Sequence, residues 1–360
     1  MVREIEVIDL FTGAGGLTAG AHYAASELKL KLNIVASVEI DPDSAFTYKE
    51  NFNPLRQYIG DICDWLKLES VPQSDLIIGG PPCQGFSSLG KQEEKDPRNI
   101  LWKDYVKTIC RSKPKYFILE NVPPFLKSRE YKELLDLTEE GGILESYTID
   151  SYILNASDFG VAQNRKRAIL IGRLKTLPEI KISPLMATPK TIREAFQGIP
   201  QKTDGIDLPK GRKYFSSKEL HLGRNYSKLS LKRFAAIPQG GNRFDIPEEL
   251  LSPCWKKHTN GSTDVMGRLR WDSPSVTIRT EFYKPEKGRY LHPIEDRAIT
   301  HFEAARIQGF PDDFMWYGSK VSIARQIGNA VPINMAKYII YNIFSSYLSF
   351  KMFLISRNKY

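Results

Sequence analysis

The chain has 360 residues, of which 41% are hydrophobic and 26% are charged. This length fits one large or two moderate domains, and the apolar fraction excludes wholesale disorder. No repeat period or biased tract occurs, which excludes collagen-like, coiled-coil and low-complexity proteins. The four cysteines lie far apart without a C-x-x-C pair, so we expect neither a disulfide framework nor a bound metal. They are Cys63, Cys83, Cys110 and Cys254.

The formal net charge of +9 is concentrated in one part of the chain. Residues 173–289 hold 23 of the 51 Lys and Arg residues but only 12 of the 42 Asp and Glu residues. Such a surface favours a polyanion through counter-ion release, although the solvated surface of any basic protein is an equally good interpretation. The charged start, MVREIEVIDLF, resembles a strand and not a signal peptide, which predicts a cytoplasmic protein. Residues 338–356 are apolar but interrupted by polar residues, so no membrane span is expected.

Residues 1–172 alternate short apolar runs with helical patterns such as Leu17–Lys29 and Trp102–Arg111. This alternation predicts an α/β fold with a mostly parallel, Rossmann-like sheet covered by helices on both faces. Ligands of such sheets bind at the carboxyl ends of the strands, near the switch in strand order. The predicted strands are Glu6–Phe11, Asn33–Val38, Arg56–Ile59, Asp75–Ile78, Tyr116–Leu119, Thr148–Leu154 and Ala168–Ile171.

After Gly172 the sequence becomes irregular and rich in Pro, Gly, Lys and Arg, with short strand-like pieces such as Ser275–Arg279. Regular patterns return at Arg297: residues 301–310 predict a short helix, and residues 322–344 predict a loop leading into a final helix. We therefore expect a first domain over residues 1–180, completed by residues 320–360. A second, smaller and irregular domain is expected over residues 181–319.

The ends of the first three predicted strands indicate a nucleoside site. The first strand leads into the glycine-rich turn 12–16, which permits close approach of a ligand to a helix N-terminus. The second strand ends at Glu39, a carboxylate suited to the two hydroxyls of a ribose. Asp61 and Ile62 follow the third strand, where they are placed to bind an adenine amino group and face. The alternative is that Glu39 and Asp61 are solvated or capping carboxylates.

The ends of the fourth to seventh predicted strands place reactive groups at the same edge of the predicted sheet as the nucleoside site. Cys83 follows two prolines after the fourth strand, and the polar stretch 84–98 predicts a loop that closes over a substrate. The other three cysteines fit the usual interpretation as small buried hydrophobic residues. Glu120 ends the fifth strand, and Arg165 and Arg167 lie between the sixth and seventh. A thiol, a carboxylate and two guanidinium groups are thereby predicted beside the nucleoside site.

With these pieces in order, the chain resembles the DNA (cytosine-5) methyltransferase family. The matching segments are FTGAGG, VEID, GDI, GGPPCQGFS, ENV, QNRKR, RAITHFEAARIQGFPDDF and QIGNAVP, and they span both ends of the chain. The resemblance implies S-adenosylmethionine as the methyl donor and a basic target-recognition region between QNRKR and Arg297. It implies cofactor contacts from Phe11, Gly13, Gly15, Gly16, Leu17, Glu39, Ile40, Asp61, Ile62, Leu101 and Asn329.

The same resemblance implies a reaction on a cytosine flipped out of double-stranded DNA. Cys83 would attack carbon 6, Glu120 would act at N3, and Arg165 and Arg167 would hold the base and its phosphate. Ser87 would lie near the DNA, and the candidate DNA contacts in the basic region are Lys232, Arg233, Arg243, Lys256, Lys257, Arg268, Arg270 and Arg279. The implied enzyme is a monomer that protects DNA from a partner restriction endonuclease. A tRNA cytosine methyltransferase and a catalytically silent DNA-binding homologue remain as alternatives.

Overall fold

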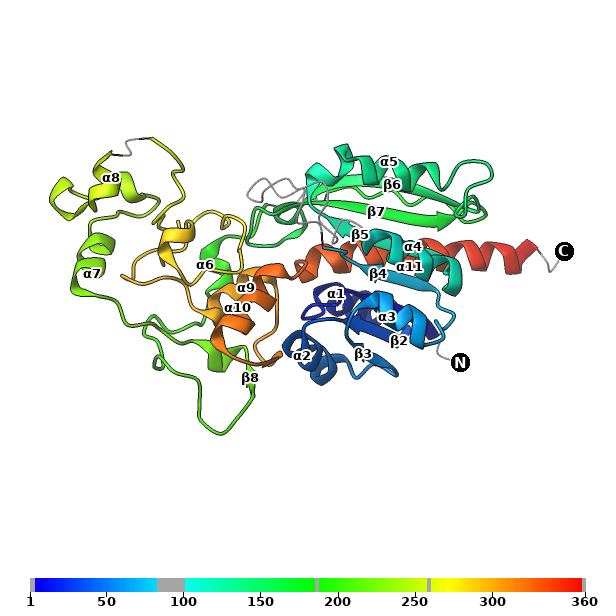
Figure 1. The fold of residues 1–360 in the computed structure, drawn as a ribbon, viewed down its shortest axis with the longest axis horizontal. Helices are drawn as coiled ribbons and strands as arrows, with labels where there is room; N and C mark the ends of the chain where they lie inside the picture. The colour runs from blue at the N-terminus through cyan, green and yellow to red at the C-terminus, as the bar shows by residue number, and fades with distance from the viewer. Residues whose placement is uncertain (1–3, 83–100, 185–187, 258–259, 358–360) are drawn as a thin grey trace. The chain divides into compact units, whose positions relative to one another are not determined.

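The computed structural model describes residues 4–82, 101–184, 188–257 and 260–357. The chain separates into two compact units (Figure 1). Unit 1 comprises Met1–Phe159, Lys166–Met186 and Val331–Tyr360, and unit 2 comprises Gly160–Arg165 and Ala187–Ala330. Unit 1 therefore combines the blue-to-green first part of the chain with the red C-terminal helix of Figure 1.

Unit 1 is built on a seven-stranded sheet with the order β3-β2-β1-β4-β5-β7-β6. The first five of these strands are parallel, and β7 pairs antiparallel with both β5 and β6. The strand order switches between β1 and β4, which is where open α/β sheets bind ligands. The strands are β1 (Glu4–Leu10), β2 (Lys31–Glu39), β3 (Gln57–Ile59), β4 (Leu76–Gly79), β5 (Tyr116–Asn121), β6 (Tyr147–Asn155) and β7 (Lys166–Leu174).

All seven strands predicted from the sequence are confirmed, with shifts of a few residues at their ends. The predicted mostly parallel sheet is confirmed as well. The helices of unit 1 are α1 (Gly16–Glu27), α2 (Pro42–Phe52), α3 (Ile62–Leu68), α4 (Leu101–Ser112), α5 (Arg129–Asp136) and α11 (Ile333–Arg357), with 3-10 turns η3 (Pro123–Lys127) and η4 (Ala156–Phe159).

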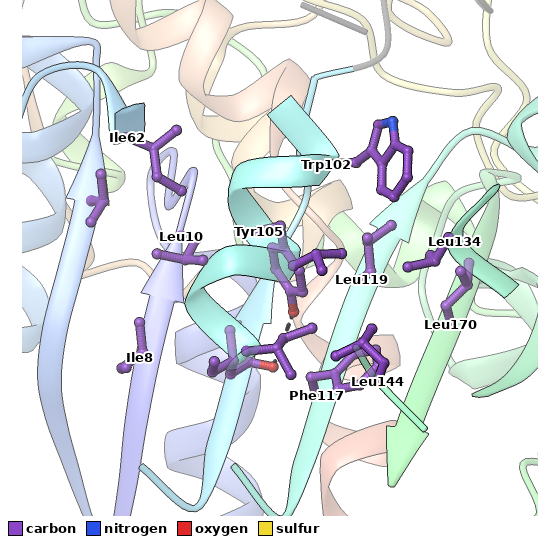
Figure 2. Close-up of a cluster of buried hydrophobic side chains, with 14 of the residues drawn as sticks. Ile8, Leu10, Ile62, Trp102, Tyr105, Phe117, Leu119, Leu134, Leu144 and Leu170 are labelled. Carbon is purple, nitrogen blue, oxygen red and sulfur yellow. Dashed lines mark hydrogen bonds between the residues drawn. The ribbon is translucent and has the colours of Figure 1, made fainter. Parts of the chain in front are cut away.

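One face of the sheet packs on α3 and α4 through a continuous hydrophobic cluster (Figure 2). Ile8 and Leu10 of β1 and Phe117 and Leu119 of β5 point into it, as expected from the two-residue period of a strand. Tyr105 of α4 lies at its centre and donates a hydrogen bond to the Ile118 carbonyl at 2.7 Å. The buried hydroxyl therefore has a partner inside an otherwise apolar core.

On the other side, α1 packs closely against α11, the helix that completes unit 1. A Cβ atom placed on Gly20 would lie 2.5 Å from Cβ of Ala336, so only a glycine permits this approach of the two helices. Gly16 lies in the same way against the backbone of Val331, just before α11. The first helix and the last helix of the chain thus form one packed pair.

Unit 2 has short elements and little sheet, as the irregular sequence predicts. Strands β8 (Tyr214–Ser216) and β9 (Met315–Tyr317) form an antiparallel pair. Ser275 makes an isolated bridge with Gln163, and the strand predicted around it does not form. The helices are α6 (Ile192–Ala195), α7 (Lys228–Ala235), α8 (Pro253–Lys257), α9 (His301–Gln308) and α10 (Lys320–Asn329), with 3-10 turns η5 (Lys218–Leu220), η6 (Arg243–Asp245), η7 (Glu248–Leu250) and η8 (Pro285–Lys287).

Two expectations for the end of unit 2 are wrong. Residues 322–329 form most of helix α10, where a loop was expected, because Ser319 caps the helix by accepting from the Ser322 amide. This helix packs on α9, so residues 320–330 belong to unit 2 and not to the first domain. Among the described residues, no helix is long and apolar enough to cross a membrane.

Candidate active site

The turn between β1 and α1 is held in an unusual backbone conformation. Phe11, Gly13 and Gly15 all have positive φ, at 56°, 53° and 87°. Positive φ is natural for glycine but strained for phenylalanine, and such strain is typical of functional turns. A Cβ on Gly13 would meet no atom within 4 Å, so the turn leaves open space there. Gly16 and Leu17 follow in the first turn of α1, where both are buried.

Glu39 ties the end of β2 to this turn. Its Oε2 accepts from the Gly13 amide at 2.7 Å, and its Oε1 accepts from the Asp41 amide at 2.8 Å. Burial raises the pKa of Glu39, although the amides of Asp41 and Gly13 oppose that shift. The neighbouring Ile40 side chain is 65% exposed. The carboxylate is therefore oriented by backbone groups beside an uncovered apolar side chain, as a nucleoside site requires.

Asp61 follows β3 and caps helix α3. Its Oδ1 accepts from the Cys63 amide at 2.7 Å. One oxygen of this carboxylate therefore caps the helix, which was the alternative to ligand binding raised for Asp61. Ile62 packs into the hydrophobic cluster, and Leu101 at the start of α4 is partly buried against the same cluster. The expected contacts of these three residues with an adenosine stay predictions.

Glu120 and Arg167 form an ion pair at the carboxyl end of β5. Nε of Arg167 lies 2.8 Å from Oε1 of Glu120, and both side chains are largely buried. A Cβ on Gly80 would lie 2.8 Å from Oε2 of Glu120, so the carboxylate lies directly against the segment after β4. Nδ2 of Asn121 also donates to the Pro81 carbonyl at 3.3 Å. The structure thus places Glu120 and Arg167 beside the residues that lead into Cys83.

Cys83 and Ser87, the expected nucleophile and one expected DNA contact, lie outside the described residues. Their position relative to Glu120 therefore stays a prediction. The first described segment, residues 4–82, ends at Pro82, directly after the buried Pro81.

Arg165 lies in unit 2, and its guanidinium is occupied by backbone groups. Its Nη1 donates to the carbonyls of Ile278 and Gly328, each at 3.0 Å, and the residue is 2% exposed. Both hydrogens of that nitrogen therefore have acceptors, and the expected contact of Arg165 with the substrate stays a prediction. Asn329, the expected cofactor contact, is exposed at the end of α10 in unit 2, and its role stays a prediction.

Sequence reasoning missed the buried amide pair that organises this part of unit 2. Nε2 of Gln163 donates to Oε1 of Gln308 at 2.8 Å, and Nε2 of Gln308 donates to the Ile327 carbonyl at 2.6 Å. Oε1 of Gln163 accepts from the Ile278 amide at 2.7 Å. The only signal in the sequence is that both glutamines lie within matched family segments, and it does not reveal that they bind each other.

Arg268 was expected on the DNA-facing surface, and this expectation is wrong. The residue is 3% exposed. Its guanidinium donates to the carbonyls of Phe234, Ile237, His292 and Glu295 and to the Asp296 carboxylate. Arginine carries five N–H donors, and here they join separate loops of unit 2 instead of facing solvent.

The other four arginines expected to contact DNA are more accessible, and Arg279 is exposed. Arg270 is exposed. Arg243 lies 4.6 Å from the Phe244 ring centre and donates to the Asn260 carbonyl. Arg233 lies over the Trp255 ring at 5.5 Å and donates to the Leu250 carbonyl. Arginines stacked on aromatic rings keep their charge at a surface, so these positions are compatible with a polyanion.

The comparisons with known proteins agree with this geometry. The model of the C-5 cytosine-specific DNA methylase family matches residues 5–345. The chain is 34% identical to the type II methyltransferase M1.HphI of Haemophilus parahaemolyticus over 92% of this chain and 84% of that protein. It is 32% identical to the type II methyltransferase M.Sau96I of Staphylococcus aureus over 94% of this chain and 75% of that protein.

A solved structure, described as a DNA modification methyltransferase encoded within an E. coli prophage, has a TM-score of 0.71 and 26% identity. It covers 95% of this chain, and this chain covers 99% of it. The family match therefore includes the glycine-rich turn, Glu39, the Glu120–Arg167 pair and the basic unit 2. The chain belongs to the C-5 cytosine-specific DNA methylase family.

Proposed function

We propose that this protein transfers a methyl group from S-adenosylmethionine to carbon 5 of a cytosine in a short, specific double-stranded DNA sequence. The observation that carries the proposal is the buried Glu120–Arg167 ion pair next to Gly80 and Pro81, two residues that lead into Cys83. A carboxyl group, a guanidinium and a thiol on neighbouring strand ends are the groups that this reaction needs. The type II methyltransferases among its relatives support a role in restriction and modification.

The residues of the β1–α1 turn fit the cofactor that the family implies. The open space at Gly13, the fixed Glu39 carboxylate and the exposed Ile40 form a cradle for a nucleoside with an extended substituent. Phe11, Gly15, Gly16 and Leu17 would line the methionine side, and Asp61, Ile62, Leu101 and Asn329 would complete the site. When bound, S-adenosylmethionine supplies an electrophilic methyl group on a sulfonium.

The chain's own groups would then make the cytosine reactive. The Cys83 thiolate adds to carbon 6 and forms a sulfur–carbon bond, which turns the ring into an enamine nucleophilic at carbon 5. Glu120 provides a proton or hydrogen bond at N3 as negative charge develops on the ring. Arg167 holds the Glu120 carboxylate and would also bind the base carbonyl. After methylation a base, for which we propose a water, takes the carbon 5 proton. The electron pair of that C–H bond restores the double bond between carbons 5 and 6, and the sulfur–carbon bond breaks with its pair returning to the Cys83 sulfur.

The cytosine must leave the DNA stack before it can react, at a cost of a few kcal/mol. We propose that the accessible arginines of unit 2 contribute to that step by binding the DNA backbone, with Arg233, Arg243 and Arg270 as candidates. Arg165 would also hold the base or its phosphate, with its Nη1 anchored by two backbone carbonyls. The cognate partner would be an endonuclease that cuts the same sequence.

Bisulfite sequencing of plasmid DNA from a methylation-free host that expresses the chain tests the proposal. Protected cytosines in one short repeated context are expected, and a Cys83→Ala variant should protect none. Soluble wild-type protein with no protected plasmid cytosine would overturn the DNA reaction. Protected cytosines in the host's tRNA would then identify the tRNA alternative, and unmodified tRNA with retained DNA binding would identify the silent homologue.

A further inference from the structure

Three buried polar side chains meet beneath the glycine-rich turn, and the mechanism above uses none of them. They are Asp9 from β1, Thr18 from α1 and Tyr48 from α2. Oγ1 of Thr18 donates to Oδ2 of Asp9 at 2.5 Å, and the Tyr48 hydroxyl lies 2.9 Å from the same Thr18 oxygen. None of the three is more than 1% exposed. The Thr18 hydroxyl is therefore the shared member of a buried triad.

The donors of the triad can be assigned from elementary chemistry. A threonine hydroxyl has one hydrogen, which Thr18 gives to the Asp9 carboxylate. The Tyr48 hydroxyl must then donate its hydrogen to the Thr18 oxygen. The chain of hydrogen bonds runs from tyrosine to threonine to aspartate, and each bond strengthens its neighbour in a buried setting.

The triad contacts the cofactor-binding turn through Tyr48. A Cβ on Gly15 would lie 2.9 Å from Cδ2 of Tyr48 and still closer to the Phe52 ring. The ring centres of Tyr48 and Phe52 are 4.9 Å apart, so the two rings support the turn together. On its other side the turn is bound by Glu39 through the Gly13 amide. The turn is thus fixed at both glycines, by Glu39 at one and by Tyr48 at the other.

A buried carboxyl group is costly to a fold, which is a reason to ask what Asp9 contributes. Burial raises the pKa of Asp9 to about 7, although Thr18 and Tyr48 favour the charged carboxylate and oppose the shift. An apolar residue of similar size would avoid this cost. Buried groups of this kind are retained where they orient a functional segment.

We propose that Thr18 is a positioning residue for methyl-donor binding, and that it acts by holding Asp9 and Tyr48 so that the turn at residues 11–15 keeps its binding conformation. The inference rests on the proposed function only in assuming that this turn binds S-adenosylmethionine. Thr18 does not touch the cofactor itself. Its hydroxyl sets the position of Tyr48, and Tyr48 sets the position of Gly15.

The test compares two substitutions that differ in one group. Thr18→Val keeps the shape but removes the hydroxyl, and Thr18→Ser keeps the hydroxyl. Dissociation constants for S-adenosylmethionine and for the product S-adenosylhomocysteine are measured by calorimetry, well below the melting temperature. We expect Thr18→Val to weaken both by about tenfold, as one lost hydrogen bond to a charged group implies, and Thr18→Ser to bind within about twofold of the wild type.

A matched control separates positioning from stability. Thr108 is a buried threonine of α4 whose hydroxyl donates only within its own helix, to the Asp104 carbonyl at 2.9 Å. Thr108→Val should lower the melting temperature to a similar degree without changing either dissociation constant. If Thr18→Val does not fold, Tyr48→Phe replaces it, because this variant keeps the ring against Gly15 and removes the hydroxyl alone.

The outcomes are distinct. Weakened binding in Thr18→Val with recovery in Thr18→Ser supports the inference. Unchanged binding in a folded Thr18→Val or Tyr48→Phe variant overturns it and leaves the proposed function intact. Absence of S-adenosylmethionine binding by the wild-type protein overturns the cofactor assignment and the inference with it.

Discussion

At the scale of single residues, the ion pair between Glu120 and Arg167 fixes the orientation of the Glu120 carboxylate. The guanidinium Nε lies 2.8 Å from the carboxylate and Nη1 donates to the Lys166 carbonyl at 2.7 Å, so an anchored guanidinium orients Glu120. Glu120→Gln should lower the rate of methyl transfer by about 100-fold or more, because an amide cannot supply the proton at N3. Single-turnover assays with labelled cofactor measure this rate.

The exposed Arg129–Glu133 pair of α5 offers a control with the same chemistry, at 2.7 Å between Nε and Oε1. Glu133→Gln should leave the transfer rate unchanged, since an exposed pair contributes little to structure or site. Equal losses of rate in both variants would contradict a catalytic role for Glu120.

Asp9 makes a second prediction at the residue scale. Burial raises the pKa of Asp9 from 3.8 to about 7, with Thr18 and Tyr48 opposing the shift and the Glu39 charge adding to it. Between these values the folded state binds a proton that the unfolded state has lost. The free energy of unfolding should therefore fall as pH rises from about 4 to 7, by up to about 4 kcal/mol from this group.

Denaturant titrations of the wild type and of Asp9→Asn across that range measure the effect. The amide stays neutral, so the stability of the variant should lack this decline. Tyr48 and Tyr105, which also interact with Asp9, have pKa values well above 10 and do not titrate in this range. Glu39 does interact with Asp9 and has a raised pKa of its own, but it is present in both proteins, so the comparison isolates the contribution of Asp9. Parallel curves for the two proteins would show that the Asp9 carboxyl is not the source of the pH dependence.

At the scale of elements, strand β7 depends on one glycine. Gly172 pairs with Phe117 of β5, and a Cβ at position 172 would collide with the Phe117 ring. Gly172→Ala should therefore destabilise unit 1 by about 1–3 kcal/mol, since the strand interior offers no room for the methyl group. Chemical denaturation measures the change.

A double variant identifies the cause of that loss. Phe117→Leu removes the ring that occupies the space, so adding Gly172→Ala to it should cost much less than adding it to the wild type. Additive losses in the double variant would show that the collision with the Phe117 ring is not the cause of the destabilisation.

The elements also mark what the sequence could and could not predict. The strands of unit 1 were predictable because each is a short apolar run between clear turn residues, and Glu120 was predictable because parallel strands end at one edge. The helix at residues 320–329 was missed because Gly328 and Pro332 suggest a loop, while the cap at Ser319 is a weak local signal. Arg268 was misassigned because sequence does not reveal which carbonyl groups surround a basic residue.

At the scale of the whole molecule, we expect the buried histidines of unit 2 and the buried carboxyl groups of unit 1 to respond to pH in opposite directions. In unit 2, burial lowers the pKa values of His292 and His301 to about 4, against an ordinary value of 6.5. Burial alone would raise the pKa of Glu303, but its ion pair with Arg297 at 2.7 Å holds it below the ordinary value. As the pH falls below 6.5, these two histidines bind protons in the unfolded chain. In the folded chain they stay neutral until the pH approaches 4.

Unit 2 should therefore lose stability between pH 6.5 and 4, by about 3 kcal/mol for each histidine at the lower limit. Unit 1, in which the pKa values of Asp9 and Glu39 are raised, should gain from those groups over the same range, although burial also lowers the pKa of His22 in this unit and opposes part of the gain. Hydrogen exchange at pH 7 and pH 5, corrected for intrinsic rates, measures the units separately. Protection should decline first in unit 2, and an equal decline in both units would contradict the assignment.

The packing of α1 against α11 has a consequence for how the protein is made. Gly16 lies against Val331, and Gly20 against Ala336, although more than 300 residues separate the partners along the chain. At about 5–20 residues per second, a ribosome delivers the second partner roughly 15 to 60 seconds after the first. During that interval α1 lacks its partner helix α11. Its packing face is then exposed, and an exposed face of this kind is a binding target for a chaperone. Because the turn at residues 11–15 precedes Gly16 directly, it is fully supported only once α11 has been made.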